Sequence, residues 1–456
     1  MANNEKKEEI YKILGTGTFG AVFTPALNNI NNNITKRNRN KYVTKIFFNK
    51  TAYNNLQTRR NKISKIMKSH KGSLFEPYQR NIILGQLNNK IKNTITNTIK
   101  TEIINKKLEE KLIELDENKI DENEKERLLN EYGNKLNIEI EIPNNTQLYG
   151  IRMPILGKSF DSLDRAFVNN ICNKCSILNI LSECNKLFKI TEYLAENGYI
   201  HGDLESRNIL LSIDHNKCEL SIIDYDRFDT FDEYIRKYVE ALEEGSFFPY
   251  GPPESTILVK DISSNKEDKN KKSKKNPNYK NNINDRIIEW IKNRIYYWQH
   301  WALKKKTIKK YYTRNDEQQF TDEIKDIVFK FIDSGKKVKL KYFDNFILGL
   351  TLLNFFRKLY DIDEFDMVGY ENLENKTVLC KSMKINSDEK IALTEFRDNV
   401  LYPMTSLTVE NRIDPKEVVK RMEKILCKFN KNENKSSSCS IQGGKRRKTR
   451  KNTYYK

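Results

Sequence analysis

Two carboxylates and one amide that could carry out a reaction together lie between residues 203 and 224 of this 456-residue chain. Asp203 and Asn208 are five residues apart in one predicted loop, and Asp224 follows an apolar, strand-like run. Phosphoryl transfer from a nucleotide needs such a set, because one carboxylate orients and deprotonates the acceptor hydroxyl while an amide and a second carboxylate hold Mg²⁺. The spacing therefore predicts Asp203 as the catalytic base and Asn208 and Asp224 as metal ligands.

The segments around these residues resemble a known family. Residues 199–211 (YIHGDLESRNILL) and residues 221–226 (SIIDYD) are similar to the catalytic loop and the metal-binding loop of the protein-kinase superfamily. The resemblance implies a protein kinase that uses ATP and Mg²⁺ and phosphorylates a protein hydroxyl, of serine or threonine in preference to tyrosine. It also implies that Leu210 forms the floor of the adenine pocket.

A glycine-rich segment near the N-terminus fits the same family. Gly15, Gly17 and Gly20 have no side chains to keep the backbone away from phosphate oxygens. A dinucleotide-binding fingerprint has similar glycines but continues into a helix, whereas here a second strand-like run begins at residue 41. The resemblance implies that Val22 covers the adenine ring and that Lys45 binds the α- and β-phosphates.

Three more features follow in the order that the family has. Residues 248–254 (FPYGPPE) resemble the end of an activation segment, and Asp344 resembles the residue that holds the catalytic-loop backbone from a buried helix start. Arg412 resembles a late arginine that would pair with Glu254. Together, these features predict an α+β, bilobal protein-kinase-like fold with a small β-rich N-lobe, a larger helical C-lobe and long charged helical insertions.

The boundary between the lobes is predicted from a strand-like run that ends in a glycine-terminated connector at residues 147–157. The N-lobe would cover residues 1–156 and the C-lobe residues 157–430. The resemblance places Met153 beside the adenine pocket as the gatekeeper and the backbone near Leu156 at the edge of the adenine. Two helices are also expected in the C-lobe, one near residues 176–197 and one over residues 346–356, which would be a core helix.

Two insertions extend this plan. Residues 89–146 have leucine and isoleucine at helical spacing and either bind a partner or cover their own lobe; we favour the second, because amphipathic helices usually pack on their own domain. Residues 256–335 begin with a lysine-rich linker and continue into a basic run with three tryptophans. That run could contact nucleic acid by stacking, but a helix that buries its tryptophans is the preferred interpretation.

The chain is strongly basic, with a net charge of +20 and a pI of about 9.3, so it will attract polyanions. Part of the excess lies in residues 431–456, a small-residue spacer followed by the cluster GGKRRKTRK. This predicted disordered tail could be a nuclear-localisation signal, a nucleic-acid-binding arm or a solubilising extension. It resembles the tails of proteins from large DNA viruses, which suggests a viral origin.

The cysteines and the hydropathy indicate an intracellular protein, with host cytoplasm, nucleus and virion left open. Seven cysteines are scattered along the chain and no secretory signal opens it, so disulfides are not expected. The pair Cys172 and Cys175 has no second pair that would complete a structural zinc site. No apolar run reaches the about 20 residues of a membrane span.

The resemblance has three departures. Glu205 stands where serine/threonine kinases have a lysine, and Arg207 stands where tyrosine kinases have an arginine that could supply the missing charge. Gly202 replaces the arginine that binds a phosphorylated activation loop, so activity without that phosphorylation is expected. Asp226 replaces a glycine and would restrict the metal-binding loop.

A glutamate on the small-lobe helix should pair with Lys45. Glu76 is the best candidate, in a predicted helix within residues 74–84, although the apolar register there would offer Arg80 instead. Pro77 suggests that Glu76 lies at or before the start of this helix.

Two other functions compete with a protein kinase. A small-molecule phosphotransferase is one, because the sequence His-Gly-Asp-Leu is common in such enzymes. Glu254, Asp344 and Arg412 count against it, since they resemble parts of a peptide-binding lobe. A non-catalytic scaffold with a degenerate kinase fold is the other, supported by Glu205, Asp226 and the insertions. The complete set of catalytic and metal-binding residues favours the protein kinase.

Overall fold

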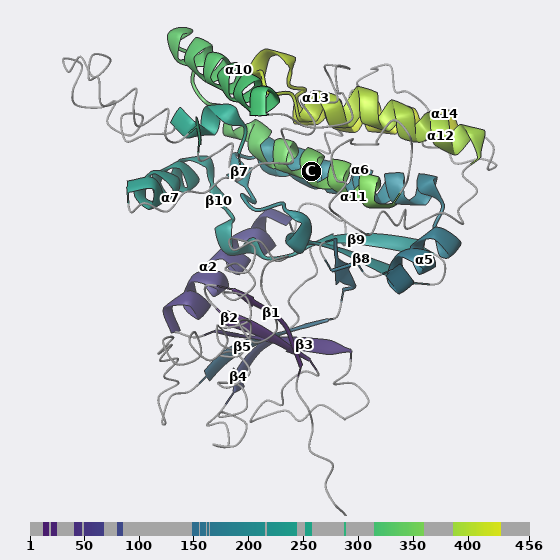
Figure 1. Cartoon of the computed structure of the whole chain (residues 1–456). Helices are drawn as coiled ribbons and strands as arrows, with labels where there is room; N and C mark the ends of the chain where they lie inside the picture. The colour runs from purple at the N-terminus through teal and green to yellow at the C-terminus, as the bar shows by residue number, and fades with distance from the viewer. Residues whose placement is uncertain are drawn as a thin grey trace, which may run out of the picture. The chain divides into compact units, whose positions relative to one another are not determined.

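The computed structural model describes residues 12–17, 20–24, 41–47, 50–67, 80–84, 148–154, 156–160, 162–163, 165–214, 217–243, 251–257, 287–288, 314–359 and 386–429. The chain forms two compact units, Met1–Lys158 with Ser221–Asp226, and Ser159–Leu220 with Arg227–Lys456. Strands dominate the first unit and helices the second, which confirms the predicted α+β class (Figure 1). The two insertions lie largely, and the tail wholly, outside the described residues, and the predicted domain boundaries stay predictions.

The first unit contains an antiparallel five-stranded sheet with the strand order β1-β2-β3-β5-β4. Its strands are β1 (Lys12–Gly17), β2 (Gly20–Thr24), β3 (Tyr42–Phe47), β4 (Arg80–Leu84) and β5 (Leu148–Pro154). Gly17 and Gly20 face each other where β1 turns into β2. The predicted glycine-rich hairpin is confirmed, as is the following strand, on which Val43, Ile46 and Phe47 are buried.

One helix, α2 (Lys50–Met67), follows β3 and contacts it and β5. Its buried face includes Tyr53, Leu56 and Ile63. The helix predicted within residues 74–84 is wrong, because β4 occupies Arg80–Leu84. The β-branched pair in the middle of that segment favours a strand. Glu76 itself lies outside the described residues.

The second unit is built mainly from helices. They are α5 (Arg165–Lys174), α6 (Ile177–Glu196), α7 (Phe231–Glu243), α10 (Arg314–Asp333), α11 (Phe343–Leu359), α12 (Ser387–Phe396), α13 (Tyr402–Met404) and α14 (Pro415–Phe429). Its strands are β6 (Lys158–Ser159), β7 (Tyr199–Ile200), β8 (Ile209–Asp214), β9 (Lys217–Ile222) and β10 (Asp229–Thr230), of which β6 and β9 begin or end in the first unit. They form the sheets β6-β8-β9 and β7-β10.

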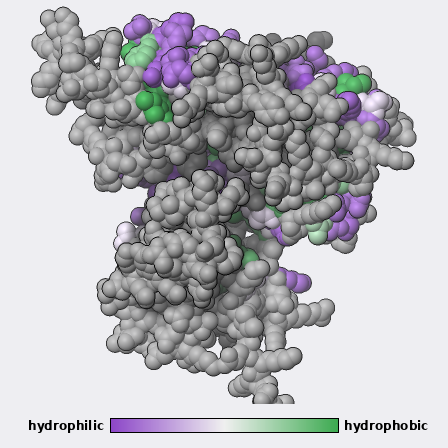
Figure 2. Space-filling model, in the orientation of Figure 1, coloured by the Kyte–Doolittle hydropathy of each residue, from purple (hydrophilic) through white to green (hydrophobic). Residues whose placement is uncertain are grey.

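The core of this unit surrounds α6 and α11, which confirms both predicted helices. Ser176 caps α6 by accepting a hydrogen bond from the Asn179 N–H at 3.1 Å. Phe356 of α11 packs edge-on against Phe396 of α12, with ring centroids 5.3 Å apart. The amphipathic helix α14 buries its apolar face. Where Figure 2 shows the surface in colour, hydrophilic residues predominate, with a few hydrophobic ones among them. No described helix is long and apolar enough to cross a membrane.

A buried ion pair joins distant parts of this unit. The Arg412 guanidinium binds both carboxylate oxygens of Glu254, with Nη2 3.2 Å from Oε2, and its Nε donates to the Ser406 carbonyl at 3.0 Å. Both side chains are almost completely buried, and Arg412 lies over the Phe346 ring at 4.9 Å. The predicted pair is confirmed, and its many hydrogen bonds offset the desolvation of two charges.

Asp344, at the start of α11, holds the loop that follows β7. Its carboxylate accepts hydrogen bonds from the backbone N–H groups of His201 at 2.7 Å and Gly202 at 2.9 Å. Burial raises the pKa of this carboxyl from an ordinary 3.8 to about 6, against the opposite effect of the two hydrogen bonds. The predicted role of Asp344 is confirmed.

Gly202 has a left-handed backbone conformation, with φ at +77°, which residues with a Cβ rarely adopt. A Cβ at this position would lie 2.5 Å from Cε2 of Tyr234, a buried ring on α7. That ring packs with Tyr238, Ile200 and Phe343 in one apolar cluster. The arginine of the family's loop is therefore excluded here by both the backbone and the packing of α7.

The expectation that disulfides are absent is wrong for the described residues. Cys175 and Cys218 are bonded, with an S–S distance of 1.99 Å, and Cys172 is disulfide-bonded as well. The Cys218 N–H donates to Asn179 Oδ1 at 2.8 Å, which brings β9 against the start of α6. A separation of 43 residues hides this proximity in the sequence. The bonded cysteines do not offer thiolate ligands for zinc.

We expect Gly202→Ala to destabilise the protein more than Gly198→Ala. Gly198 has a similar φ of +74° but open space around its Cβ position, so it isolates the backbone cost of about 1–2 kcal/mol. Gly202→Ala must also displace the Tyr234 ring, which should add about 1–3 kcal/mol. Urea unfolding of both variants measures the difference. Equal losses would show that the Tyr234 ring moves aside freely.

The raised pKa of Asp344 predicts a pH-dependent stability. The folded state holds the proton more tightly than the unfolded state, so this group's contribution is complete below pH 4 and is lost as the pH rises through about 6. Compared with Asp344→Asn, which does not titrate, the wild type should gain about 2 kcal/mol between pH 7.5 and pH 4.5. Urea unfolding of both proteins at the two pH values gives this double difference. If the wild type instead lost stability relative to Asp344→Asn on going from pH 7.5 to pH 4.5, the two hydrogen bonds would lower the pKa of Asp344 more than burial raises it.

Candidate active site

Lys45 lies in the middle of the first unit's sheet. On β3 it is opposite Val22 of β2 and Ile151 of β5. Its Nζ is 3.1 Å from Asp224 Oδ1 and 3.0 Å from Asp226 Oδ2. The strand lysine and the loop after β9 therefore meet, although 179 residues separate Lys45 from Asp224.

The loop that carries the two aspartates has an unusual backbone. Asp224 has φ at +61°, the non-glycine residue with a positive φ in the described part of the chain. Aspartate tolerates this conformation better than most residues. Tyr225 behind it is completely buried, as expected for the aromatic position of the family's loop. The carboxylate of Asp224 thus stays partly exposed, at 36%, where a cation could reach it.

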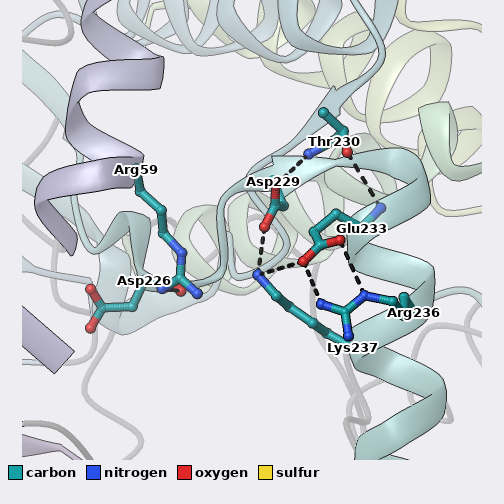
Figure 3. A network of polar contacts seen from close by, with 7 residues as sticks. All are labelled: Arg59, Asp226, Asp229, Thr230, Glu233, Arg236 and Lys237. Atoms are coloured by element: carbon teal, nitrogen blue, oxygen red, sulfur yellow. Dashed lines mark hydrogen bonds and ion pairs between the residues drawn. The ribbon is translucent and has the colours of Figure 1, made fainter. Parts of the chain in front are cut away.

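Asp226 is held more deeply than Asp224, with 15% of its side chain exposed. Burial raises the pKa of its carboxyl, the Lys45 ammonium opposes the shift, and the Asp224 carboxylate adds to it. Its backbone carbonyl accepts a hydrogen bond from the Arg59 guanidinium of α2 (Figure 3). Two cations from the sheet and the helix therefore contact this one residue.

The second unit presents the loop with the predicted base. The Asn208 Nδ2 group donates to the Asp203 carbonyl at 2.8 Å and closes the loop. The Thr351 hydroxyl of α11 donates to the Leu204 carbonyl at 2.9 Å. Because the amide nitrogen of Asn208 is used inside the loop, its oxygen is the atom that it can offer to a cation. Amide and carboxylate oxygens are ligands that Mg²⁺ prefers, so Asn208 in this unit and Asp224 in the first each have a chemistry that suits this ion.

Asp203 has a basic neighbour, and a separate ion pair lies in the same loop. Arg227 Nη1 lies 3.5 Å from Asp203 Oδ1. Arg207 donates through Nε to Glu205 Oε1 at 2.9 Å and is itself largely exposed. The two departures in this loop therefore form an ion pair with each other, and Glu205 offsets the charge that Arg207 was expected to supply.

A polar network fixes α7 immediately after this region (Figure 3). Lys237 Nζ binds the buried Asp229 Oδ2 at 2.6 Å, and Arg236 binds Glu233 through both carboxylate oxygens. Thr230 caps the helix by accepting from the Glu233 N–H at 3.3 Å. The predicted activation segment thus starts with the strand β10, which pairs with β7, and continues into the helix α7, which this network holds in place.

The predicted site residues fall into two groups. Those of the first unit are Gly15, Gly17, Gly20, Val22, Lys45, Met153, Leu156 and Asp224. Those of the second unit are Asp203, Arg207, Asn208 and Leu210. Each group is held by its own unit, in which Lys45 meets Asp224 and Asn208 meets Asp203.

The sequence interpretation missed the contacts of Asp226 and Arg59. It assigned the partner of Lys45 to Glu76, which lies outside the described residues, and the helix that the structure describes after β3, α2, has no acidic residue over Lys50–Met67. The lack of any carboxylate in the first helical segment after β3 was the available signal. It would have directed attention to the aspartate that replaces a glycine.

Comparison with known proteins agrees with this geometry. A family model described as protein tyrosine and serine/threonine kinase matches residues 9–256, more than half of the chain. The chain is also 37% identical to the tyrosine-protein kinase TXK of Homo sapiens over 85 residues, which are 18% of this chain and 14% of that protein. The match thus spans a small part of the curated relative, whereas the family model extends from the glycine-rich hairpin to Glu254. The chain belongs to the protein tyrosine and serine/threonine kinase family and has the bilobal fold of that family.

Proposed function

We propose that this protein is an active kinase that transfers the γ-phosphoryl group of ATP to a serine or threonine hydroxyl of a protein. The ion pair between Lys45 and Asp224 is the observation that carries the proposal. It joins the residue proposed for the phosphates with a residue proposed for the metal. In the second unit, the loop with Asp203 is held by Asp344 and Thr351, as positioning of a catalytic group requires.

In the proposed reaction, Asp203 orients the acceptor hydroxyl and takes its proton. The hydroxyl oxygen forms a bond to the γ-phosphorus, the bond from that phosphorus to the β–γ bridging oxygen breaks, and ADP leaves. Lys45 offsets charge on the α- and β-phosphates. Mg²⁺, held by Asn208 and Asp224, would supply further charge neutralisation.

The nucleotide would lie against the residues assigned to it from the sequence. Backbone N–H groups near Gly15, Gly17 and Gly20 would approach the phosphates. The adenine would contact the residues of the predicted pocket, which are Val22, Met153, Leu156 and Leu210.

The preference for serine or threonine is part of the proposal. Arg207 is the feature that pointed to tyrosine, and its ion pair with Glu205 weakens that argument. The human relative is named a tyrosine kinase, but its match covers 85 residues. A viral origin and contact of residues 431–456 with polyanions are further proposals, supported by the composition and the basic cluster. An intracellular location is a proposal that now rests on the basic cluster, because the bonded cysteines remove the argument from absent disulfides.

A protein that binds nucleotide without turnover is the second candidate. Glu205 favours it, because this carboxylate stands where a lysine would stabilise the transferred phosphoryl group and neutralises the nearby Arg207. Turnover separates the two candidates directly.

We expect purified protein to transfer radiolabel from the γ-phosphate of ATP to generic protein acceptors in the presence of Mg²⁺. Asp203→Ala and Lys45→Met should each reduce the rate by about 10²–10⁴-fold, and chelation of Mg²⁺ should abolish transfer. Glu219→Gln, which removes an exposed carboxylate from β9, is the matched control. Phosphoamino-acid analysis identifies the acceptor residue.

Binding of ATP without transfer by the wild type would contradict the proposal and support the second candidate. Transfer to small hydroxyl compounds but to no protein would establish the small-molecule phosphotransferase instead. Label on tyrosine alone would overturn only the serine/threonine assignment.

A further inference from the structure

Lys45 is contacted by two carboxylates from one loop, and they differ in their surroundings. Asp224 Oδ1 and Asp226 Oδ2 lie at nearly the same distance from Nζ, at 3.1 and 3.0 Å. Asp224 keeps 36% of its side chain exposed, whereas Asp226 keeps 15%. The more exposed carboxylate, of Asp224, is accessible to a cation that binds and dissociates. The more buried carboxylate, of Asp226, suits a permanent partner of Lys45.

The described helix beside the sheet, α2, offers no carboxylate to Lys45. No residue of α2 is acidic. Its buried residues Leu56 and Ile63 lie three before and four after Arg59, so Arg59 belongs to the same face of the helix. The helix therefore presents a cation to the loop after β9.

Arg59 is used to hold the loop. Its guanidinium donates to the backbone carbonyl of Asp226, while the side chain of Asp226 points to Lys45. A positive helix side chain thus fixes the main chain of the residue whose negative side chain fixes the lysine. The cation of the helix therefore holds the loop, and the carboxylate of the loop contacts Lys45.

We propose that Asp226 is a positioning residue of Lys45 and holds it from the metal-binding loop, the task that the family assigns to a helix glutamate. The inference rests on the proposed function, in which Asp224 is a metal ligand. If the Asp224 carboxylate binds the metal, part of its negative charge is neutralised and it attracts Lys45 less strongly. Asp226 does not bind the metal in this proposal and keeps its contact with Lys45. Where the family has a glycine, this chain thus has a carboxylate that contacts Lys45.

Three substitutions at position 226 test the assignment. Asp226→Asn removes the charge and keeps the shape, Asp226→Glu keeps the charge and changes the length, and Asp226→Gly restores the family residue. Asn and Gly should lower kcat by about 10–100-fold, because a phosphate-binding group is misplaced, with KM for ATP changed only a few-fold. Asp226→Glu should stay within about ten-fold of wild type, and Glu219→Gln is the matched control.

The order of the variants separates positioning from packing. A residue needed only for its size would be better replaced by the isosteric asparagine than by the longer glutamate. If Asp226→Asn is as active as Glu219→Gln, or more active than Asp226→Glu, the proposal is wrong. The midpoint of thermal unfolding of each variant shows whether it is folded, and Asp226→Glu keeps the test valid if Asp226→Gly does not fold.

Failure of this inference and failure of the proposed function give different results. An active wild type with an equally active Asp226→Asn overturns the inference alone. A wild type that binds ATP but transfers nothing overturns the proposed activity. ATP affinity then replaces kcat as the readout, and Asp226→Asn should weaken binding in the same direction as Lys45→Met. Unchanged binding in Asp226→Asn beside weakened binding in Lys45→Met would overturn the inference.

Discussion

The hydrogen bonds from the His201 and Gly202 N–H groups to Asp344 fix the loop on which the proposed chemistry depends. Two turns later on the same helix, the Thr351 hydroxyl donates to the Leu204 carbonyl. The helix α11 thus binds both donors and an acceptor of the loop's main chain. A buried carboxylate is expensive to ionise, which its raised pKa reflects, yet it satisfies two backbone groups that would otherwise lose their contact with water.

Local patterns in the sequence predicted the parts of the site that lie within one short segment. The glycine hairpin, the strand of Lys45 and the loop from Asp203 to Asn208 each depend on neighbours a few residues away. The pairs of Glu254 with Arg412 and of Asp344 with the loop are long-range contacts. Their prediction depended on the resemblance, because spacing alone does not bring such residues together.

The errors had the opposite character. The helix expected within residues 74–84 conflicted with the β-branched pair of β4, whose strand partners on β5 lie more than 60 residues later. The bond between Cys175 and Cys218 depends on the packing of β9 against α6. The contact of Asp226 with Lys45 required knowledge that α2 has no carboxylate to offer. In each case tertiary contacts, which no local pattern reports, decided the outcome.

The packing of α7 has a consequence for covalent modification of this protein. Tyr234 and Tyr238 are 6% and 2% exposed, and both rings belong to the cluster with Phe343. A modifying enzyme needs its acceptor hydroxyl in an extended, accessible segment, but these two are enclosed in a helix that Lys237 and Thr230 secure at its start. Before either tyrosine could receive a phosphate, α7 would have to separate from Ile200, Leu340 and Phe343. The Tyr234 ring, which leaves no room for a side chain at Gly202, is therefore itself inaccessible to kinases, as is Tyr238.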